Sequence, residues 1–163
     1  MKQASESETL HRMAAYCSSA ERCIQDVRRK VELAGMTPEA SDRIIARLVK
    51  EKFIDERRFA GSFVNDKLRF NKWGRVKISY ELSRKGIPQD CRAEALEAID
   101  EEKYFDILCS VLKEKMKTMK TKGGHELFAK LLRFAAGRGF ESRETITCLR
   151  QLLNTAEDGE YFD

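Results

Sequence analysis

The sequence predicts an all-α protein built as an elongated tandem array of three three-helix repeats. A glycine followed by an apolar residue recurs at Gly35, Gly86 and Gly139, with a period of about fifty residues. Pro38 and Pro88 both fall where a helix is expected to begin. Strand signals are nearly absent, because no alternating β-branched run is bounded by an Asn-Gly or Asp-Gly turn.

Helical periodicity divides the chain into five parts. Residues 1–8 are rich in Ser and Glu and are expected to form a disordered N-terminal tail. Repeat 1 covers 9–54, repeat 2 covers 55–100 and repeat 3 covers 101–154. Residues 155–163 are expected to form a loose, acidic C-terminal tail. Each repeat is close to the lower size limit for folding alone, so neighbouring repeats are expected to stabilise one another.

Repeat 1 shows three amphipathic stretches in order. The first covers 9–17 and the second runs from Ile24 to Ala34, where a glycine provides a natural stop. Thr37 supplies a capping hydroxyl for the third helix, whose apolar stripe closes near Ile54.

Repeat 2 opens at Asp55 and Glu56, an acidic start that suits a helix N-terminus. An aromatic stripe follows in its first helix, made by Phe59, Phe63 and Phe70. After a loop over 71–74, the next helix is expected to bury Val76, Ile78 and Leu82, and a short acidic helix starts at Pro88.

Repeat 3 begins with a long helix from about Glu102 to Met119, which residues 120–124 interrupt. Its second helix carries apolar residues from Leu127 to Ala135, and its third carries them from Ile146 to Leu153.

The net charge of +4 is modest, but basic and acidic segments alternate along the chain. Residues 57–85 hold nine basic and two acidic side chains, and 103–138 hold nine and three; 86–102 and 139–163 are acidic. If the repeats stack in register, the basic segments gather into a positive face that attracts polyanions or an acidic protein. The alternative is that these are ordinary solvated helix faces.

Five scattered cysteines form no C-x-x-C pair, so the sequence indicates neither a disulfide framework nor a zinc site. Each is expected to be a reduced, apolar filler within a helix, as in the cytoplasm. Neither a signal peptide nor a membrane span is expected.

Catalytic chemistry is poorly represented. The two histidines, His11 and His125, lie in unrelated contexts, and no H-E-x-x-H or phosphate-binding glycine loop is present. We therefore expect no enzyme activity, no catalytic residue, no metal ion and no cofactor.

Binding chemistry is better represented, because arginine and lysine bind phosphates and carboxylates. The candidate binding residues share a positive charge and a place in repeat 2: Arg57, Arg58, Lys67, Arg69, Lys72, Arg75, Lys77, Arg84 and Lys85. Trp73, in the middle of this set, could stack on a base or fill the core, and the core is favoured.

Each repeat could also be a helix-turn-helix module for duplex DNA, but base-reading residues are sparse, since Gln25 and Gln89 are isolated. A third interpretation is a scaffold for some other acidic protein.

The middle of the chain carries a set of motifs at defined distances. They are the stretch LVKEKFIDERRFA at 48–60, then SFV at 62–64, Trp73-Gly74, Lys77-Ile78, Glu81-Leu82 and Lys85-Gly86-Ile87. In these residues the chain resembles the RecX family of bacterial RecA regulators. Two departures are clear. Arg75 follows Gly74 where the family often has proline, and Cys23 stands where the first repeat usually has serine.

The resemblance implies a non-catalytic, cytoplasmic regulator of DNA repair, recombination and the SOS response. It implies binding along the groove of the RecA–single-stranded DNA filament, with inhibition of ATP hydrolysis, co-protease activity and strand exchange. The expected partner is the RecA filament, with weak electrostatic contact to single- or double-stranded DNA as a further possibility. No membrane partner is expected, and the chain is expected to be a monomer.

Overall fold

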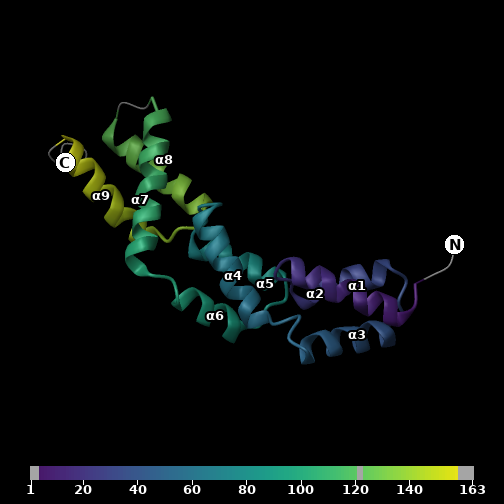
Figure 1. The fold of residues 1–163 in the computed structure, drawn as a ribbon. Helices are drawn as coiled ribbons and strands as arrows, with labels where there is room; N and C mark the ends of the chain where they lie inside the picture. The colour runs from purple at the N-terminus through teal and green to yellow at the C-terminus, as the bar shows by residue number, and fades with distance from the viewer. Residues whose placement is uncertain (1–3, 121–122, 158–163) are drawn as a thin grey trace. The chain divides into compact units, whose positions relative to one another are not determined.

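A computed structural model describes residues 4–120 and 123–157, with the side chains of 154–157 left aside. Every regular element in these ranges is a helix (Figure 1). Repeat 1 contains α1 (Glu6–Ser19), α2 (Ile24–Leu33) and α3 (Pro38–Lys50). Repeat 2 contains α4 (Glu56–Arg69), α5 (Arg75–Arg84) and α6 (Gln89–Glu97). Repeat 3 contains α7 (Glu101–Thr118), α8 (Gly124–Gly137) and α9 (Ser142–Glu157).

Helices α1 and α9 extend into the segments predicted to be tails. Helix α1 begins at Glu6, inside the predicted tail, because the Ser5 side chain caps it by accepting a hydrogen bond from the Glu8 amide at 3.1 Å. Helix α9 continues to Glu157, inside the predicted C-terminal tail, and residues 158–163 lie outside the described residues.

The turn that ends the second helix of each repeat has the same chemistry three times. Gly35, Gly86 and Gly139 have φ of 90°, 76° and 93°, a left-handed conformation that favours glycine. The next amide in each turn donates back five residues, as Ile87 does to the Leu82 carbonyl at 3.1 Å. This pairing satisfies carbonyls at the helix end, so the periodic glycines are stop signals.

The described chain forms two compact units, and their boundary runs through repeat 2. We call Met1–Phe63 with Leu82–Ala95 unit 1, and Val64–Glu81 with Leu96–Asp163 unit 2. Helices α4, α5 and α6 therefore each contribute residues to both units.

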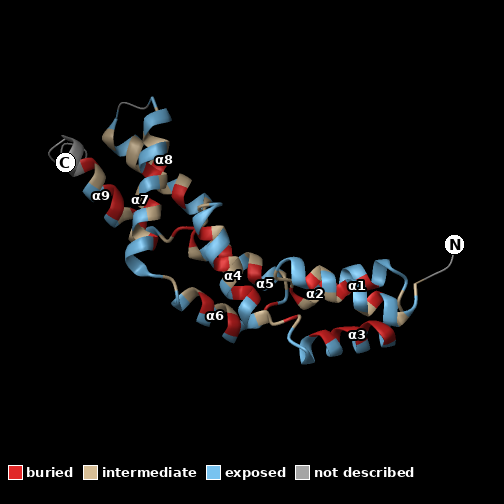
Figure 2. Ribbon diagram, in the orientation of Figure 1, coloured by how far each residue is buried: buried red, intermediate tan, exposed pale blue. Residues whose placement is uncertain are grey.

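Unit 1 is organised around α1, α2 and α3, which pack against one another. Its core includes Met13, Val27, Val31, Ile44 and Leu48, all at helical spacing on the inward faces. Figure 2 shows this burial along the side of α3 that meets its neighbours.

Unit 2 is organised around α7, α8 and α9, which also pack pairwise and lie side by side in Figure 1. Tyr104, Leu108 and Leu112 of α7 are fully buried, as are Leu131 of α8 and Leu149 of α9. The long first helix of repeat 3 therefore supplies a continuous apolar stripe to this core.

Val76, which is predicted to be buried, and Phe70, which is predicted to extend an aromatic stripe, are both exposed. Phe70 is 73% exposed and Val76 is 58% exposed. Ile78 and Leu82 define the buried side of α5, and Val76 lies two residues from Ile78, which turns it about 200° around the helix.

The cysteines depart from their predicted state. Cys109 of α7 and Cys148 of α9 are joined as a disulfide, with their Cα atoms 5.9 Å apart. Direct packing of α7 on α9 creates this proximity, which a separation of 39 residues does not reveal. Cys17, Cys23 and Cys91 are buried thiols. Cys23 lies at the N-cap position just before α2, without a side-chain capping hydrogen bond, and not within a helix.

Candidate functional site

The predicted cations divide between the two units. Unit 1 holds Arg57, Arg58, Arg84 and Lys85, and unit 2 holds Lys67, Arg69, Lys72, Arg75 and Lys77. Their surroundings differ, so each group is described by itself.

Three of the unit 1 cations, Arg57, Arg58 and Lys85, are paired with carboxylates of the same chain. Arg57 binds Asp90, with Nη2 and Oδ2 3.1 Å apart, and also binds Glu94 of the same helix. Arg58 Nε lies 2.5 Å from Glu21 Oε2. These arginines are therefore part of the internal bonding of unit 1 as well as of its surface.

The start of α2 docks between α4 and the end of α5, and we call this contact the first junction. The Ile24 amide donates to Glu56 Oε2 at 3.1 Å, and Gln25 Nε2 donates to the Arg84 carbonyl at 3.1 Å. Lys85 Nζ lies 3.3 Å from Asp26 Oδ1. Burial raises the pKa of Glu56, the hydrogen bond from Ile24 opposes this change, and the nearby charge of Asp26 adds to it.

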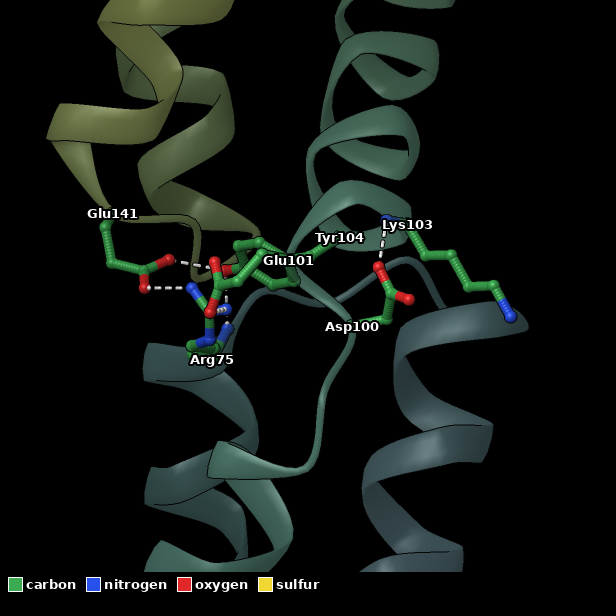
Figure 3. Close-up of polar contacts among 6 residues, drawn as sticks. All are labelled: Arg75, Asp100, Glu101, Lys103, Tyr104 and Glu141. Carbon is green, nitrogen blue, oxygen red and sulfur yellow. Dashed lines mark hydrogen bonds and ion pairs between the residues drawn. The ribbon is translucent and has the colours of Figure 1, made fainter.

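Arg75 is predicted to belong to a basic binding face, but most of its side chain is buried. Its side chain is only 17% exposed, and its guanidinium binds Glu141 and Glu101, with Nη1 3.0 Å from Glu141 Oε2 (Figure 3). The guanidinium carbon also lies 3.9 Å from the Tyr104 ring centroid. Arg75 therefore holds the start of α5 against α7 and α9.

Tyr104 completes this contact beside the guanidinium. Its hydroxyl accepts a hydrogen bond from the Arg75 amide at 2.9 Å and donates to Glu141. Burial is the main cause that raises the pKa of Tyr104. Burial also disfavours ionised Glu141, but the hydrogen bonds from Tyr104, its own backbone and Arg75 outweigh that effect and lower its pKa.

Backbone hydrogen bonds join residues 74–76 to residues 138–139. We call these bonds, together with the contacts of Arg75 and Tyr104, the second junction. The Gly74 amide donates to the Arg138 carbonyl at 2.8 Å, and the Val76 amide donates to the Gly139 carbonyl at 3.0 Å. A Cβ at Gly74 would lie 2.4 Å from the Gly139 carbonyl carbon, so the chains meet at glycine-only distance.

The other unit 2 cations lie in residues 67–80 together with exposed and half-buried apolar side chains, and we call this set the Trp73 cluster. It consists of Lys67, Arg69, Phe70, Lys72, Trp73, Val76, Lys77 and Tyr80. Lys67 Nζ and Lys77 Nζ lie 4.9 and 4.5 Å from the Trp73 ring centroid, and Arg69 Cζ lies 5.7 Å from that of Phe70. Trp73 is half-buried, so it packs against the protein and also contributes to the surface.

The exposed apolar area of the cluster is large. Phe70, Tyr80 and Val76 are 73%, 61% and 58% exposed. Large apolar side chains among cations are typical of binding surfaces, since aromatic residues and arginine supply much of the binding energy at interfaces. Sequence reasoning missed Phe70 and Tyr80, although the cations beside Phe70 are a signal that could have placed it at the surface.

Lys72 has an unusual backbone conformation for its residue type. Its φ is 57°, in the left-handed region, at the turn after α4. A side chain in this region costs about 1 kcal/mol relative to glycine. Lys52, at the turn after α3, has φ of 65°, so glycine at either position would relieve the backbone.

Neither metal binding nor membrane insertion has support among the residues that the structure describes. In those ranges, His, Cys, Asp and Glu form no group of three or more suited to a metal ion. No described helix is long and apolar enough to cross a bilayer. The described residues thus form an all-helical repeat fold that carries cations and exposed aromatic side chains at 67–80.

Comparisons with known proteins identify the family. The family pattern described as "RecX, second three-helix domain" matches residues 55–96. The regulatory protein RecX of Prosthecochloris aestuarii is 30% identical over 148 residues, which cover 90% of this chain and 94% of that protein. The chain therefore belongs to the RecX family of regulatory proteins.

Other relatives are longer. The regulatory protein RecX of Clostridium beijerinckii is 28% identical over 131 residues, and the match spans 61% of that protein's length. A crystal structure of RecX from Lactobacillus salivarius has a TM-score of 0.81 at 18% identity, covering 90% of this chain and 96% of that one. This likeness confirms the all-α three-helix repeat fold predicted from the sequence.

Proposed function

We propose that this chain binds the RecA–single-stranded DNA filament and inhibits its ATPase, co-protease and strand-exchange activities. Membership in the RecX family indicates a regulatory protein, and the Trp73 cluster is the observation that supports direct binding. Its cations favour a polyanionic or acidic target, and its exposed aromatic rings supply apolar anchors.

The proposed mechanism is restraint of the filament. Contacts at several points on one filament act together, so modest individual contacts give high overall affinity. ATP turnover requires the filament geometry to change, and a protein bound across neighbouring subunits would resist that change. No catalytic group of this chain takes part.

We propose a binding surface with fewer residues than the set of nine cations predicted from the sequence. Arg75 is held in the second junction, and Arg57, Arg58 and Lys85 are paired with carboxylates. We therefore assign the main contact to Lys67, Arg69, Lys72 and Lys77, with Phe70 and Tyr80 beside them.

Duplex-DNA recognition by a helix-turn-helix is less well supported. The third helix of repeat 2, α6, would enter the major groove, yet it carries Asp90, Glu94 and Glu97 against the single cation Arg92. Phosphates would repel such a helix.

The sharpest test removes one charge without loss of fold. Lys72→Gly relieves the left-handed backbone, so it retains stability while it removes a cation of the Trp73 cluster. Lys52→Gly is the matched control, because Lys52 has φ of 65° in unit 1. RecA-catalysed ATP hydrolysis on single-stranded DNA is measured with wild type and both variants. We expect Lys72→Gly to need severalfold more protein for half inhibition, and Lys52→Gly to match wild type.

A second pair tests the apolar anchor. Phe70→Ala removes a 73% exposed ring of the cluster, and Leu33→Ala removes an 81% exposed side chain of unit 1. We expect about tenfold weaker inhibition for Phe70→Ala alone, the scale of an interface hot spot. Absence of inhibition by the wild type would refute the function, and equal effects within each pair would refute the assigned surface.

A further inference from the structure

The disulfide of unit 2 has one buried and one accessible sulfur. Cys148 of α9 is fully buried, whereas Cys109 of α7 is partly exposed. Cys109 lies in the wall of an open groove of about 970 Å³, between α7 and α9, that is also lined by Phe105, Ser110, Lys113, Met116 and Leu152. A small molecule in this groove can therefore reach one sulfur of the pair and not the other.

The remaining thiols are poor competitors for the same chemistry. Cys17, Cys23 and Cys91 are all buried. Burial raises the pKa of each, in the case of Cys23 to about 11, and the thiolate is the reactive form. Oxidation of this chain should therefore select the Cys109–Cys148 pair.

We propose that Cys109 and Cys148 form a site of reversible thiol–disulfide exchange with low-molecular-weight disulfides, and that this exchange sets the stability of unit 2. The Cys109 thiolate attacks one sulfur of the small disulfide and forms a mixed disulfide, and one small thiol leaves. The Cys148 sulfur then attacks Cys109 Sγ, closes the protein disulfide and releases the second small thiol. Two protein thiols and one small disulfide become one protein disulfide and two small thiols, and the reverse sequence reduces the protein.

The Cys109–Cys148 disulfide closes a loop of chain over residues 109–148, and the contents of this loop explain why the exchange affects the whole of unit 2. The loop contains α8 and the turn at Gly139, whose carbonyl receives the Val76 amide in the second junction. It also contains Glu141, which binds Arg75. A bond across this loop restricts the unfolded chain and leaves the folded contacts in place, so oxidation stabilises unit 2.

The test uses the full chain and its only tryptophan. Trp73 lies in unit 2, so its fluorescence follows the unfolding of that unit. The chain is equilibrated with glutathione disulfide or with excess dithiothreitol, freed of small molecules and heated. A loop of 39 residues predicts an unfolding midpoint about 10 °C higher for the oxidised form. Thiol counting after denaturation is expected to find three thiols in the oxidised form and five in the reduced form.

Matched variants assign the effect to this pair. Cys109→Ser should remove the difference between the two midpoints, and its partly exposed position makes the change tolerable. Cys91→Ser, at a buried thiol outside the pair, should retain the difference. Five thiols after oxidation, a persistent glutathione adduct or equal midpoints for the wild type would each overturn the proposal. None of these readouts involves RecA, so they stand apart from the proposed function.

Discussion

The two junctions solve the same problem with different chemistry. In each, the start of a repeat's second helix donates a backbone amide to a side chain of the following repeat. Ile24 donates to Glu56 in the first junction, and Arg75 donates to Tyr104 in the second. Cys23 and Gly74, just before these amides, both lie twelve residues ahead of the glycine that ends the helix turn. The junctions are therefore equivalent positions in the repeat.

The difference lies in what surrounds the shared hydrogen bond. The first junction adds side-chain contacts, from Gln25 to the Arg84 carbonyl and from Lys85 to Asp26. The second adds the ion pairs of Arg75 with Glu101 and Glu141, and also two hydrogen bonds between backbones, at a distance that only glycine allows. Contacts made by side chains alone tolerate substitution, whereas backbones at this distance leave no room for an added side chain.

The largest expected effect on stability therefore comes from adding a single methyl group in the second junction. Gly74→Ala places a Cβ 2.4 Å from the Gly139 backbone, which cannot move aside as a flexible side chain would. We expect a loss of about 3 kcal/mol in the free energy of unfolding of unit 2. Urea unfolding followed by Trp73 fluorescence measures it.

Gly61→Ala is the control for this change. Gly61 lies inside α4, is exposed, and an added Cβ meets no atom within 4 Å. Alanine is the better helix former, so we expect about 0.5–1 kcal/mol of added stability. A Gly74→Ala protein as stable as wild type would show that the second junction is as adaptable as the first.

A smaller effect comes from the side chains that accept the shared amides. Tyr104→Phe deprives the Arg75 amide of its acceptor and Glu141 of a donor, so we expect a loss of about 2 kcal/mol. Glu56→Gln keeps an acceptor for Ile24 and removes a half-buried charge, so we expect a change of less than about 0.5 kcal/mol. Denaturant unfolding of both variants measures the contrast. Equal losses would mean that the two acceptors do not differ as proposed.

The smallest expected effect is that the stability of the two junctions changes in opposite directions with pH. The raised pKa of Glu56 means that the fold favours its protonated form, so its contribution to stability grows as pH falls toward the ordinary value of 4.5. The lowered pKa of Glu141 means the reverse, and its contribution is lost as pH falls below 4.5. Hydrogen-exchange protection factors are measured by NMR for the two amides. In acid, the Arg75 amide should lose protection relative to the Ile24 amide, and parallel loss at both would contradict this assignment.

Much of the fold follows from local signals in the sequence. Gly35, Gly86 and Gly139 require a left-handed turn, and apolar spacing defines the helices between them. Helix ends were missed by a few residues where a cap such as Ser5 extends them. The two-unit grouping could not be predicted, because it depends on contacts between residues far apart in the chain.

The candidate site was predicted only as a set of charges. Composition counts Lys67 and Arg75 alike as positive charges. It cannot tell that Lys67 lies beside the half-buried Trp73 ring and Arg75 between two carboxylates. Pairing is a property of tertiary contact, as it is for Cys109 and Cys148. The departure at Arg75 from the proline often found in the family also gains a reason, because proline has no amide to donate to Tyr104.

The second junction also determines how α5 can meet a phosphate. Helix starts usually offer unpaired amides that cradle anions and add little dependence on salt. Here the amides of Gly74, Arg75 and Val76 are all occupied by the protein itself. An anionic ligand near this end of α5 would therefore depend on ammonium and guanidinium groups for much of its binding, and these groups release counterions when they bind. Association with such a ligand would then weaken steeply as ionic strength rises.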